Sequence, residues 1–287
     1  MSFYNQSHLG YYRGGKRVID FYNNHITSRR ERYPFEINQE FIPYVEEMNK
    51  NGFCIIKDFF DRKLLLNFKK EVEELISEGD VEKVREVQNG NHVIIKQPFV
   101  NTKLATKIAF DQRLIDMATI FYNAVPAIGT CNLRLSEPND NSVEGTNMFH
   151  RDFNSPVKLM KFFFYLTDVG PKNGPFTYVQ GSNREMIKNW SDYHRWPDSE
   201  IEKHYGKDRI KHLTANVGDV ILGTTNGFHK GLKIEEGRRL MFTINFLIHP
   251  EIENADIKKE GKRFFIRKED FDMLGKNKPV ADFLIRE

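Results

Sequence analysis

The sequence predicts an α+β fold in which a β-sandwich or barrel is flanked by N-terminal helices. Up to residue 125 the apolar residues recur mainly at helical spacing, whereas from Pro126 onward they form short runs separated by Gly, Asn, Asp and Pro. Helices followed by many short strands are typical of one α+β unit. With 287 residues, 39% hydrophobic and 29% charged, the chain can bury a large core and belongs to the globular class.

The N-terminal part is expected to support the strands. Residues 1–36 are polar and aromatic, and we expect them to form an extended arm or a short helix on the body. Residues 37–125 are expected to form a helical support, because apolar residues such as Leu65, Phe68 and Val72 share one helix face. We expect helices over Ile37–Asn51, from Asp61 to Gly79 and over Arg113–Tyr122, with a short buried strand over Phe53–Ile56.

Residues 126–250 are expected to form a β-rich core and residues 251–287 a C-terminal tail, within a single domain spanning residues 1–287. An insertion over residues 183–212 carries both tryptophans and is expected to be partly helical. This insertion can act as a lid over the core or as a cover on the outer sheet, and both roles stay open. Strands are expected over Ala127–Leu135, Leu159–Leu166, Thr177–Val179, Val220–Leu222 and Arg239–Ile248.

The composition argues against several classes of partner. The net charge is only +3 and acidic and basic residues are interleaved, so no stripe for nucleic acid is expected. No apolar run is long enough to cross a bilayer, and the N-terminus lacks the pattern of a signal peptide. Cys54 and Cys131 lie in apolar contexts, which predicts buried free thiols in a reducing cytosol. We expect a cytoplasmic protein that is a monomer or a homodimer.

The spacing of His150 and Asp152 indicates a metal site. In an extended segment, side chains two residues apart point to the same face. A second histidine would complete a set of two imidazoles and one carboxylate, which leaves neighbouring positions open on Fe(II) for oxygen chemistry. His229, about 80 residues later, follows a turn and a buried strand and is the best candidate. The alternatives are a loop pair at 150 and 152, a packing role for His229, and His249 as the third ligand.

Two arginines at the start of the last core strand offer a place for a carboxylate. Arg238 and Arg239 follow the turn Glu235–Gly237. An arginine there could reach back into the barrel and hold a carboxylate with both arms of its guanidinium. Alternation along the strand puts Arg239, Met241 and Thr243 on one face.

These motifs occur in a definite order along the chain. His-x-Asp is followed by the run Asn173–Asn183, by a Gly-Asp pair before a strand, by His229, and ten residues later by Arg239. Over approximately residues 40–250 this order resembles the phytanoyl-CoA dioxygenase family. The family run usually ends in Pro-Gly-Ser-His, whereas here it ends in Gln180-Gly181-Ser182-Asn183, a departure within a turn. The resemblance implies a double-stranded β-helix, a jelly roll related to the cupins, with Fe(II), 2-oxoglutarate and O2 as cofactors.

The resemblance also assigns roles position by position. It assigns iron ligation to His150, Asp152 and His229. It assigns binding of the C5 carboxylate of 2-oxoglutarate to Arg239 rather than to Arg238. Thr243 lies on the same strand face as Arg239. Three further positions match residues that line the cosubstrate pocket of the family: Lys96, Leu133 and Phe163. A surface position for Lys96 and an ordinary core position for Phe163 are the alternatives.

The activity implied is hydroxylation of a C–H bond of a small-molecule substrate, with release of succinate and CO2. Relatives that halogenate replace the ligand carboxylate by a small residue, so Asp152 favours hydroxylation or a related oxidation. Two other classes remain open: a non-catalytic jelly-roll module that binds a ligand, and a cupin-type metalloenzyme that does not use 2-oxoglutarate. The full set of His150, Asp152, His229 and Arg239 speaks against the binding module, which has no need of it. Arg239 speaks against the second class, because such an enzyme has no distal carboxylate to hold. The fold and the iron site do not choose the substrate.

Overall fold

Two antiparallel sheets form the centre of the computed structural model, which describes residues 15–78, 84–86, 92–95, 97–138, 147–152, 159–185, 195–248 and 264–287. From edge to edge, the larger sheet contains β1 (Phe53–Ile56), β8 (Val220–Gly223), β5 (Met160–Tyr165), β10 (Arg239–Leu247), β4 (Ala127–Ser136), β3 (His92–Ile95) and β2 (Val84–Glu86). The smaller sheet contains β7 (Ile210–Leu213), β6 (Phe176–Val179) and β9 (His229–Gly231).

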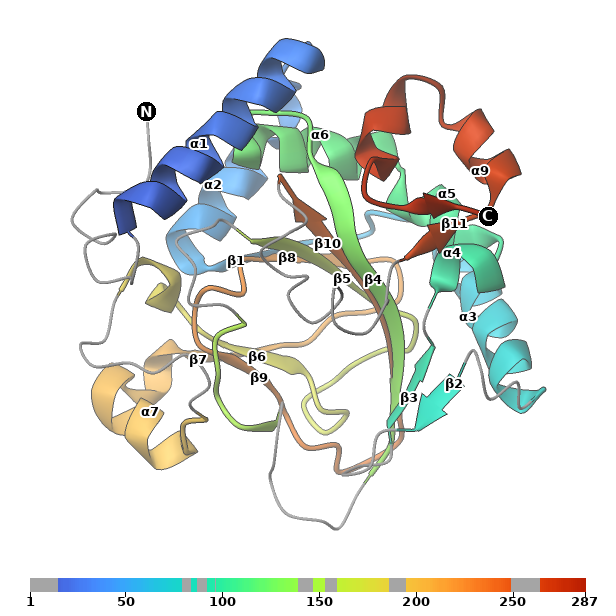
Figure 1. Ribbon diagram of the computed structural model, residues 1–287. Coiled ribbons are helices and arrows are strands. Elements are labelled where there is room, and N and C mark those ends of the chain that lie inside the picture. Colours follow the sequence, from blue (N-terminus) through green and yellow to red (C-terminus); the bar gives the residue numbers. More distant parts are fainter. Residues whose placement is uncertain are drawn as a thin grey trace.

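The two sheets pack face to face (Figure 1). One apolar cluster lies between them, with Phe163 and Ile221 from the larger sheet and Phe176 and Tyr178 from the smaller sheet. This is the double-stranded β-helix that the sequence predicts, and the expected strands are confirmed as β1, β4, β5, β6, β8 and β10. The other four strands of these two sheets were not predicted, because they are short and, as in the His-Lys-Gly of β9, have little apolar alternation.

Amphipathic helices cover the outer face of the larger sheet (Figure 1). They are α2 (Ile42–Asn51), preceded by the 3-10 turn η2 (Gln39–Phe41), α3 (Arg62–Ser77) and α6 (Gln112–Tyr122). Asp61 begins α3, since its side chain accepts the N–H of Leu64 at 2.9 Å. The buried stripe of α3 includes Phe68, whose ring meets Phe242 of β10 edge to face with centroids 5.0 Å apart. Within the described residues, no helix combines the length and apolar character that a membrane span requires.

The N-terminal arm contains a longer helix than the sequence predicts. Helix α1 (Gly15–Arg32) has 18 residues, and Arg29 near its end is buried. The Arg29 guanidinium donates to the carbonyl oxygens of Pro126 and Pro279, both at 2.9 Å, and pairs with Asp282 at 3.1 Å. Contacts with distant parts of the chain thus stabilise a helix whose own sequence has little apolar periodicity.

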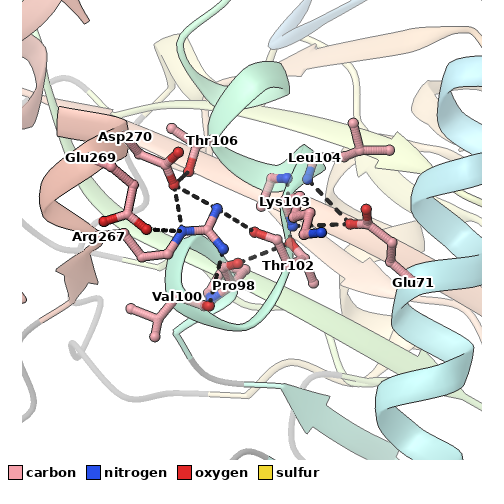
Figure 2. Close-up of polar contacts among 11 residues, drawn as sticks. Glu71, Pro98, Val100, Thr102, Lys103, Leu104, Thr106, Arg267, Glu269 and Asp270 are labelled. Atoms are coloured by element: carbon pink, nitrogen blue, oxygen red, sulfur yellow. Dashed lines mark hydrogen bonds and ion pairs between the residues drawn. The ribbon is translucent and has the colours of Figure 1, made fainter. Parts of the chain in front are cut away.

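The C-terminal segment packs on the connectors between α3 and α6. It contains β11 (Phe265–Ile266), α9 (Lys268–Met273), the 3-10 helix η6 (Gly275–Ala281) and β12 (Ile285–Arg286), and the connectors are α4 (Pro98–Asn101) and α5 (Leu104–Ala109). Figure 2 shows the polar contacts. Arg267 binds Asp270 at 2.7 Å and donates to the carbonyl oxygen of Thr102 at 3.3 Å. Glu71 of α3 accepts the N–H of Leu104 at 3.2 Å and so caps α5.

The described part of the 183–212 insertion covers the outer face of the smaller sheet. It contains the 3-10 turn η4 (Ser182–Arg184), α7 (Asp198–Tyr205) and the 3-10 turn η5 (Lys207–Arg209). Ile201 and Tyr205 of α7 pack against Phe149, Val179 and Phe228, which lie on the side of that sheet away from the larger one. Of the two roles that the sequence left open, residues 195–209 therefore have that of a cover, as the position of α7 in Figure 1 illustrates. The last residues of the expected insertion, 210–212, instead form part of strand β7 of the smaller sheet.

Candidate metal centre

His150 and His229 face each other across one antiparallel ladder. The segment around His150 extends the smaller sheet beside β9, and the N–H of each histidine donates to the carbonyl oxygen of the other, at 3.0 and 2.9 Å. Side chains at directly opposed positions point to the same side of a sheet. The two imidazole rings accordingly lie with their centroids 4.3 Å apart, and both side chains are buried.

Backbone carbonyl groups hold both imidazoles in one tautomer. Nδ1 of His150 lies 2.9 Å from the oxygen of Met148, and Nδ1 of His229 lies 3.0 Å from the oxygen of Gly227. A carbonyl oxygen can only accept, so each Nδ1 carries the hydrogen and each Nε2 keeps its lone pair. Burial and the facing His229 lower the pKa of His150 against the opposing effect of Asp152, which favours the neutral ring. Neutral imidazoles of this kind are metal ligands.

Asp152 supplies a third ligand atom. Its Oδ1 lies 3.3 Å from Nε2 of His229 and 3.6 Å from Nε2 of His150, and one ligand atom from each of the three residues lies within 4.8 Å of the others. Its N–H donates to the carbonyl oxygen of Thr225 at 3.1 Å, which holds it on the same ladder. Burial raises the pKa of Asp152, but the Lys161 ammonium and the two imidazoles outweigh burial and hold this pKa well below its usual range.

Two glycines make room for the ring that supports His229. The ring of Tyr178 lies nearly parallel to that of His229, with centroids 6.4 Å apart, and its hydroxyl donates to the carbonyl oxygen of Thr224 at 2.7 Å. A Cβ on Gly52 would lie 2.2 Å from the Tyr178 ring, and a Cβ on Gly227 2.0 Å from its hydroxyl. Gly227 also presents the carbonyl group that fixes the His229 tautomer, so its small size and the ligand position are linked.

Arg151 and Lys230, which follow His150 and His229 in sequence, point away from the site. They bind the two ligand-bearing segments to the part of the chain on the other side of the smaller sheet. Arg151 donates from Nη2 to the carbonyl oxygens of Ser182 and Glu185, both at 2.8 Å. Lys230 pairs with Asp198 of α7 at 2.6 Å. Because side chains alternate along extended segments, the neighbours of inward-facing ligands face outward. The cover formed by α7 therefore also holds the ladder that carries the ligands.

Arg239 lies buried at the start of β10 and has no acidic partner among the described residues. Its Nη1 donates to the carbonyl oxygen of Gly174 and its Nη2 lies 3.5 Å from Oγ of Ser136, while its Nε has no hydrogen-bond partner in the described part of the chain. An uncompensated buried guanidinium is costly, so this position fits an anionic ligand. Arg238 instead faces α3, where it pairs with Glu73 at 2.6 Å.

The register of the central strands brings Thr243 and Phe163 to the face that carries Arg239. Thr243 lies opposite Asn132 on one side and Phe163 on the other. Phe163 stacks on Phe176 with centroids 4.5 Å apart, inside the cluster between the sheets. Both residues that the sequence predicts near the cosubstrate therefore lie in the interior of the double sheet.

The prediction that Leu133 lines the same pocket is wrong. Leu133 pairs with Phe242 and packs in the core on the helix side of the larger sheet. Alternate residues of a strand face opposite sides, so the inward-facing positions of β4 are those of Asn132 and Arg134, not that of Leu133. Two other predicted candidates lie outside the described residues: Lys96 and His249.

A comparison with family models shows to which family this chain belongs. The model described as Phytanoyl-CoA dioxygenase (PhyH) matches residues 48–235, about two thirds of the chain. The chain belongs to this family. The resemblance drawn from the motifs is confirmed, and the match contains His150, Asp152 and His229 but ends before Arg239. A comparison with curated proteins finds no significant match.

Solved structures share the fold of this PhyH-family chain. SnoK, a non-heme alpha ketoglutarate dependent carbocyclase from nogalamycin biosynthesis, is 13% identical with a TM-score of 0.60, over 78% of this chain and 91% of SnoK. EctD from S. alaskensis, solved with bound Fe, is 19% identical with a TM-score of 0.58, over 75% and 77%. HygX from Streptomyces hygroscopicus, solved with nickel and 2-oxoglutarate, is 17% identical with a TM-score of 0.56, over 74% and 87%. At these identities the likeness shows the fold.

Family membership makes the protein a non-haem iron oxygenase that depends on 2-oxoglutarate, with Fe(II), 2-oxoglutarate and O2 as cofactors. The residues present fit this chemistry. Two neutral imidazoles and an ionised carboxylate are a donor set for Fe(II). The buried guanidinium of Arg239, with its unpaired Nε, fits the carboxylate of the cosubstrate.

Two interior cations of this PhyH-family chain were not predicted from the sequence. Lys161 of β5 places its Nζ 2.5 Å from Oδ2 of Asp152. Arg134 of β4 lies half-buried opposite Met241, near enough to Asp152 and Arg239 for its charge to act on both. Burial lowers the pKa of Arg134 and Asp152 opposes that effect. Strand alternation could have placed both side chains in the interior, but only the fold shows which charges they meet.

Proposed function

We propose that this oxygenase hydroxylates a C–H bond of a small-molecule substrate, with cleavage of 2-oxoglutarate to succinate and CO2 in the same turnover. The observation that carries the proposal is the presence of two features in one interior. The first is the convergence of ligand atoms from His150, Asp152 and His229. The second is the buried Arg239, whose Nε is unpaired within the described chain. A ligand-binding module needs neither feature, and a metalloenzyme that does not use 2-oxoglutarate has no use for Arg239.

In this proposal His150, Asp152 and His229 bind the iron. The Nδ1 hydrogen bonds keep both imidazoles in the tautomer that directs Nε2 inward. Lys161 and the two imidazoles keep the Asp152 carboxylate ionised despite its burial. Three protein ligands leave three neighbouring positions open on Fe(II). When bound, the metal supplies the activation of O2 that oxidises first the cosubstrate and then the substrate.

Arg239 and Thr243 are proposed to bind the far end of 2-oxoglutarate. The planar guanidinium can hold the C5 carboxylate with two parallel hydrogen bonds, and the Thr243 hydroxyl on the same face can donate a third. Phe163 and Phe176 line the adjacent wall and exclude water from the reacting groups. Met241, between the two polar residues, stays partly exposed although β10 lies in the middle of the sheet, so a ligand can reach this face.

Asp152 favours hydroxylation over halogenation, because a halide would need the position on iron that this carboxylate takes. Proteins with solved structures of this fold carry out different reactions, since SnoN is described as an epimerase and SnoK as a carbocyclase. Structures of SnoN with nogalamycin RO and of EctD with 5-hydroxyectoine support a small molecule as the class of substrate here. Hydroxylation requires only that one C–H bond of the substrate lies near the iron, and it needs no second reacting group on the substrate.

We propose that residues 1–287 act as one oxygenase domain, as a monomer or a homodimer without nucleic acid or membrane partners. In support, β1 from the N-terminal part is an edge strand of the larger sheet, and Arg29 joins α1 to the C-terminal segment. The proposed compartment is the cytoplasm, in keeping with the buried free thiols of Cys54 and Cys131.

Labelling with 18O2 tests the proposed reaction. The protein with Fe(II), ascorbate and 2-oxoglutarate is incubated with a metabolite library, and the compound that stimulates succinate release is taken as the substrate. Hydroxylation predicts a product that gains one oxygen atom derived from O2. A product that has lost two hydrogen atoms and gained no oxygen would rule out hydroxylation while leaving the oxygenase class intact. If no compound stimulated succinate release and no succinate formed in the absence of substrate, the proposed reaction would be contradicted.

A further inference from the structure

The two oxygens of the Asp152 carboxylate have different neighbours. Oδ1 lies 3.3 Å from Nε2 of His229 and 3.6 Å from Nε2 of His150, on the side where both lone pairs meet. Oδ2 lies 2.5 Å from Nζ of Lys161. Only one oxygen of the carboxylate is thus directed to the position where the imidazoles converge, and an ammonium group holds the other.

The position of Lys161 is set by the larger sheet and not by the ladder that carries the ligands. Lys161 lies in β5, between β8 and β10, and is paired with Gly223 on one side and Asn245 on the other. Its side chain is only 17% exposed and shares the inner face with Phe163. A lysine on a strand hydrogen-bonded on both sides has a well-defined backbone position, so the ammonium is a fixed point against which Asp152 can be oriented.

We propose that Lys161 is a positioning residue that makes Asp152 bind iron through one oxygen only. This inference rests on the proposed function. A carboxylate can bind a metal through one oxygen or through both. With one oxygen, the site keeps three open positions, of which 2-oxoglutarate takes two and O2 one. With both oxygens, Asp152 would occupy one of those positions itself, and the cosubstrate and O2 could no longer bind together.

A purely structural ion pair would have other consequences. Replacing one partner of a buried pair leaves the other charge uncompensated and lowers the stability of the fold. If Lys161 were only a structural partner, its replacement would not change the number of open positions on the metal once iron neutralises the carboxylate. The binding of 2-oxoglutarate to the iron-loaded protein therefore separates the two roles, because only the positioning role predicts that it weakens.

The test compares Lys161→Met and Lys161→Arg with the wild-type protein and with Lys172→Met as a matched control. Methionine keeps an unbranched apolar stem nearly as long as that of lysine but has no charge and cannot donate a hydrogen bond, whereas arginine keeps the charge. Lys172 also pairs with a carboxylate at 2.5 Å, that of Glu236, but both side chains are exposed, at 60% and 63%, and Glu236 is not a metal ligand. The anaerobic Fe(II) proteins are titrated with 2-oxoglutarate, and the melting temperature is measured for each.

The Fe(II) form of Lys161→Met is expected to bind 2-oxoglutarate about 10–100-fold more weakly, the range found when partners of metal ligands are removed. Lys161→Arg and Lys172→Met should stay near the wild-type affinity. Infrared difference spectra of the Co(II)-loaded minus metal-free protein, with 13C-labelled aspartate, should show the smaller splitting of carboxylate bands typical of two-oxygen binding in Lys161→Met alone. If Lys161→Met does not fold, Lys161→Gln, which also removes the charge, replaces it in both measurements.

Wild-type affinity for 2-oxoglutarate in the Fe(II) form of the neutral variant would overturn the inference. So would a lower melting temperature or weaker Fe(II) binding with cosubstrate affinity unchanged, since either would leave Lys161 a structural partner. Failure of the proposed function looks different, because in that case the wild-type protein itself would not bind 2-oxoglutarate through iron.

Discussion

The imidazoles of His150 and His229 occupy directly opposed positions of one antiparallel ladder and repeat the same local contact. Each donates its Nδ1 hydrogen to the carbonyl oxygen two residues before it, that of Met148 or that of Gly227. The ladder sets the distance between the rings and the carbonyl groups set their tautomer, so the backbone alone defines two of the three ligand positions. Asp152, two residues along the same segment, completes the set.

Arg239→Met should weaken 2-oxoglutarate binding strongly and leave Fe(II) binding nearly unchanged. Removing the charged partner of a buried carboxylate costs about 2–5 kcal/mol, which corresponds to a loss of affinity of about 30-fold or more. The measurement is the apparent affinity for 2-oxoglutarate in succinate release, with Fe(II) affinity measured separately. Arg238→Met is the matched control, because Arg238 pairs with Glu73 on the helix side. An equal effect of the two replacements would mean that Arg239 does not bind the cosubstrate.

Gly227→Ala should lower the affinity for Fe(II) by about 10–100-fold, as expected when the group that orients a ligand imidazole is displaced. The added Cβ would lie 2.0 Å from the Tyr178 hydroxyl, so the loop must shift together with the carbonyl group that holds His229. Gly52→Ala strains the same ring but offers no carbonyl group to the ligand. Both replacements should lower the melting temperature, and Fe(II) affinity should fall clearly more for Gly227→Ala. The same Fe(II) affinity in the two variants would argue against a role of the Gly227 carbonyl.

The thiol of Cys54 should stay protonated far above neutral pH in the folded protein. Burial, together with the neighbouring Glu47 carboxylate, raises the pKa of Cys54 to about 12, whereas an unfolded cysteine has a pKa of about 8.5. The unfolded state therefore loses its proton first, so the contribution of this group to stability is full below about pH 8.5 and is lost as the pH rises toward about 12.

Alkylation by iodoacetamide checks this expectation. At pH 8 the folded protein should react very slowly and the urea-unfolded protein quickly. Urea unfolding should also show lower stability at pH 10 than at pH 8 in the wild-type protein, with a smaller difference in Cys54→Ala. Rapid alkylation of the folded protein at pH 8 would contradict the raised pKa.

The parts of the site that could be predicted from the sequence are those defined by local spacing. The alternation of His150 and Asp152, and that of Arg239 and Thr243, follows from extended backbone alone. Leu133 was placed on the wrong face because the register of β4 against β10 decides which of its side chains meet those of Arg239 and Thr243, and that register is not local.

Long-range partners account for the rest of what was missed. Lys161 lies in a strongly apolar strand, and its pairing with Asp152 could not be predicted because only the fold brings the two side chains together. Helix α1 was underestimated because Arg29 is held by Asp282 and by carbonyl groups far along the chain. The family resemblance supplied the double sheet, which the order of helices followed by short strands alone left as a sandwich or a barrel.

The central claim is that His150, Asp152 and His229 hold one Fe(II) to which 2-oxoglutarate binds directly. Anaerobic addition of 2-oxoglutarate to the Fe(II) protein should produce a visible metal-to-ligand charge-transfer band that saturates at one equivalent of each, and Asp152→Ala should not produce it. Asp168→Ala, which removes a carboxylate that pairs with Arg62 away from the site, should keep the band. Absence of the band from the wild-type protein at saturating 2-oxoglutarate, or its full retention in Asp152→Ala, would contradict the claim.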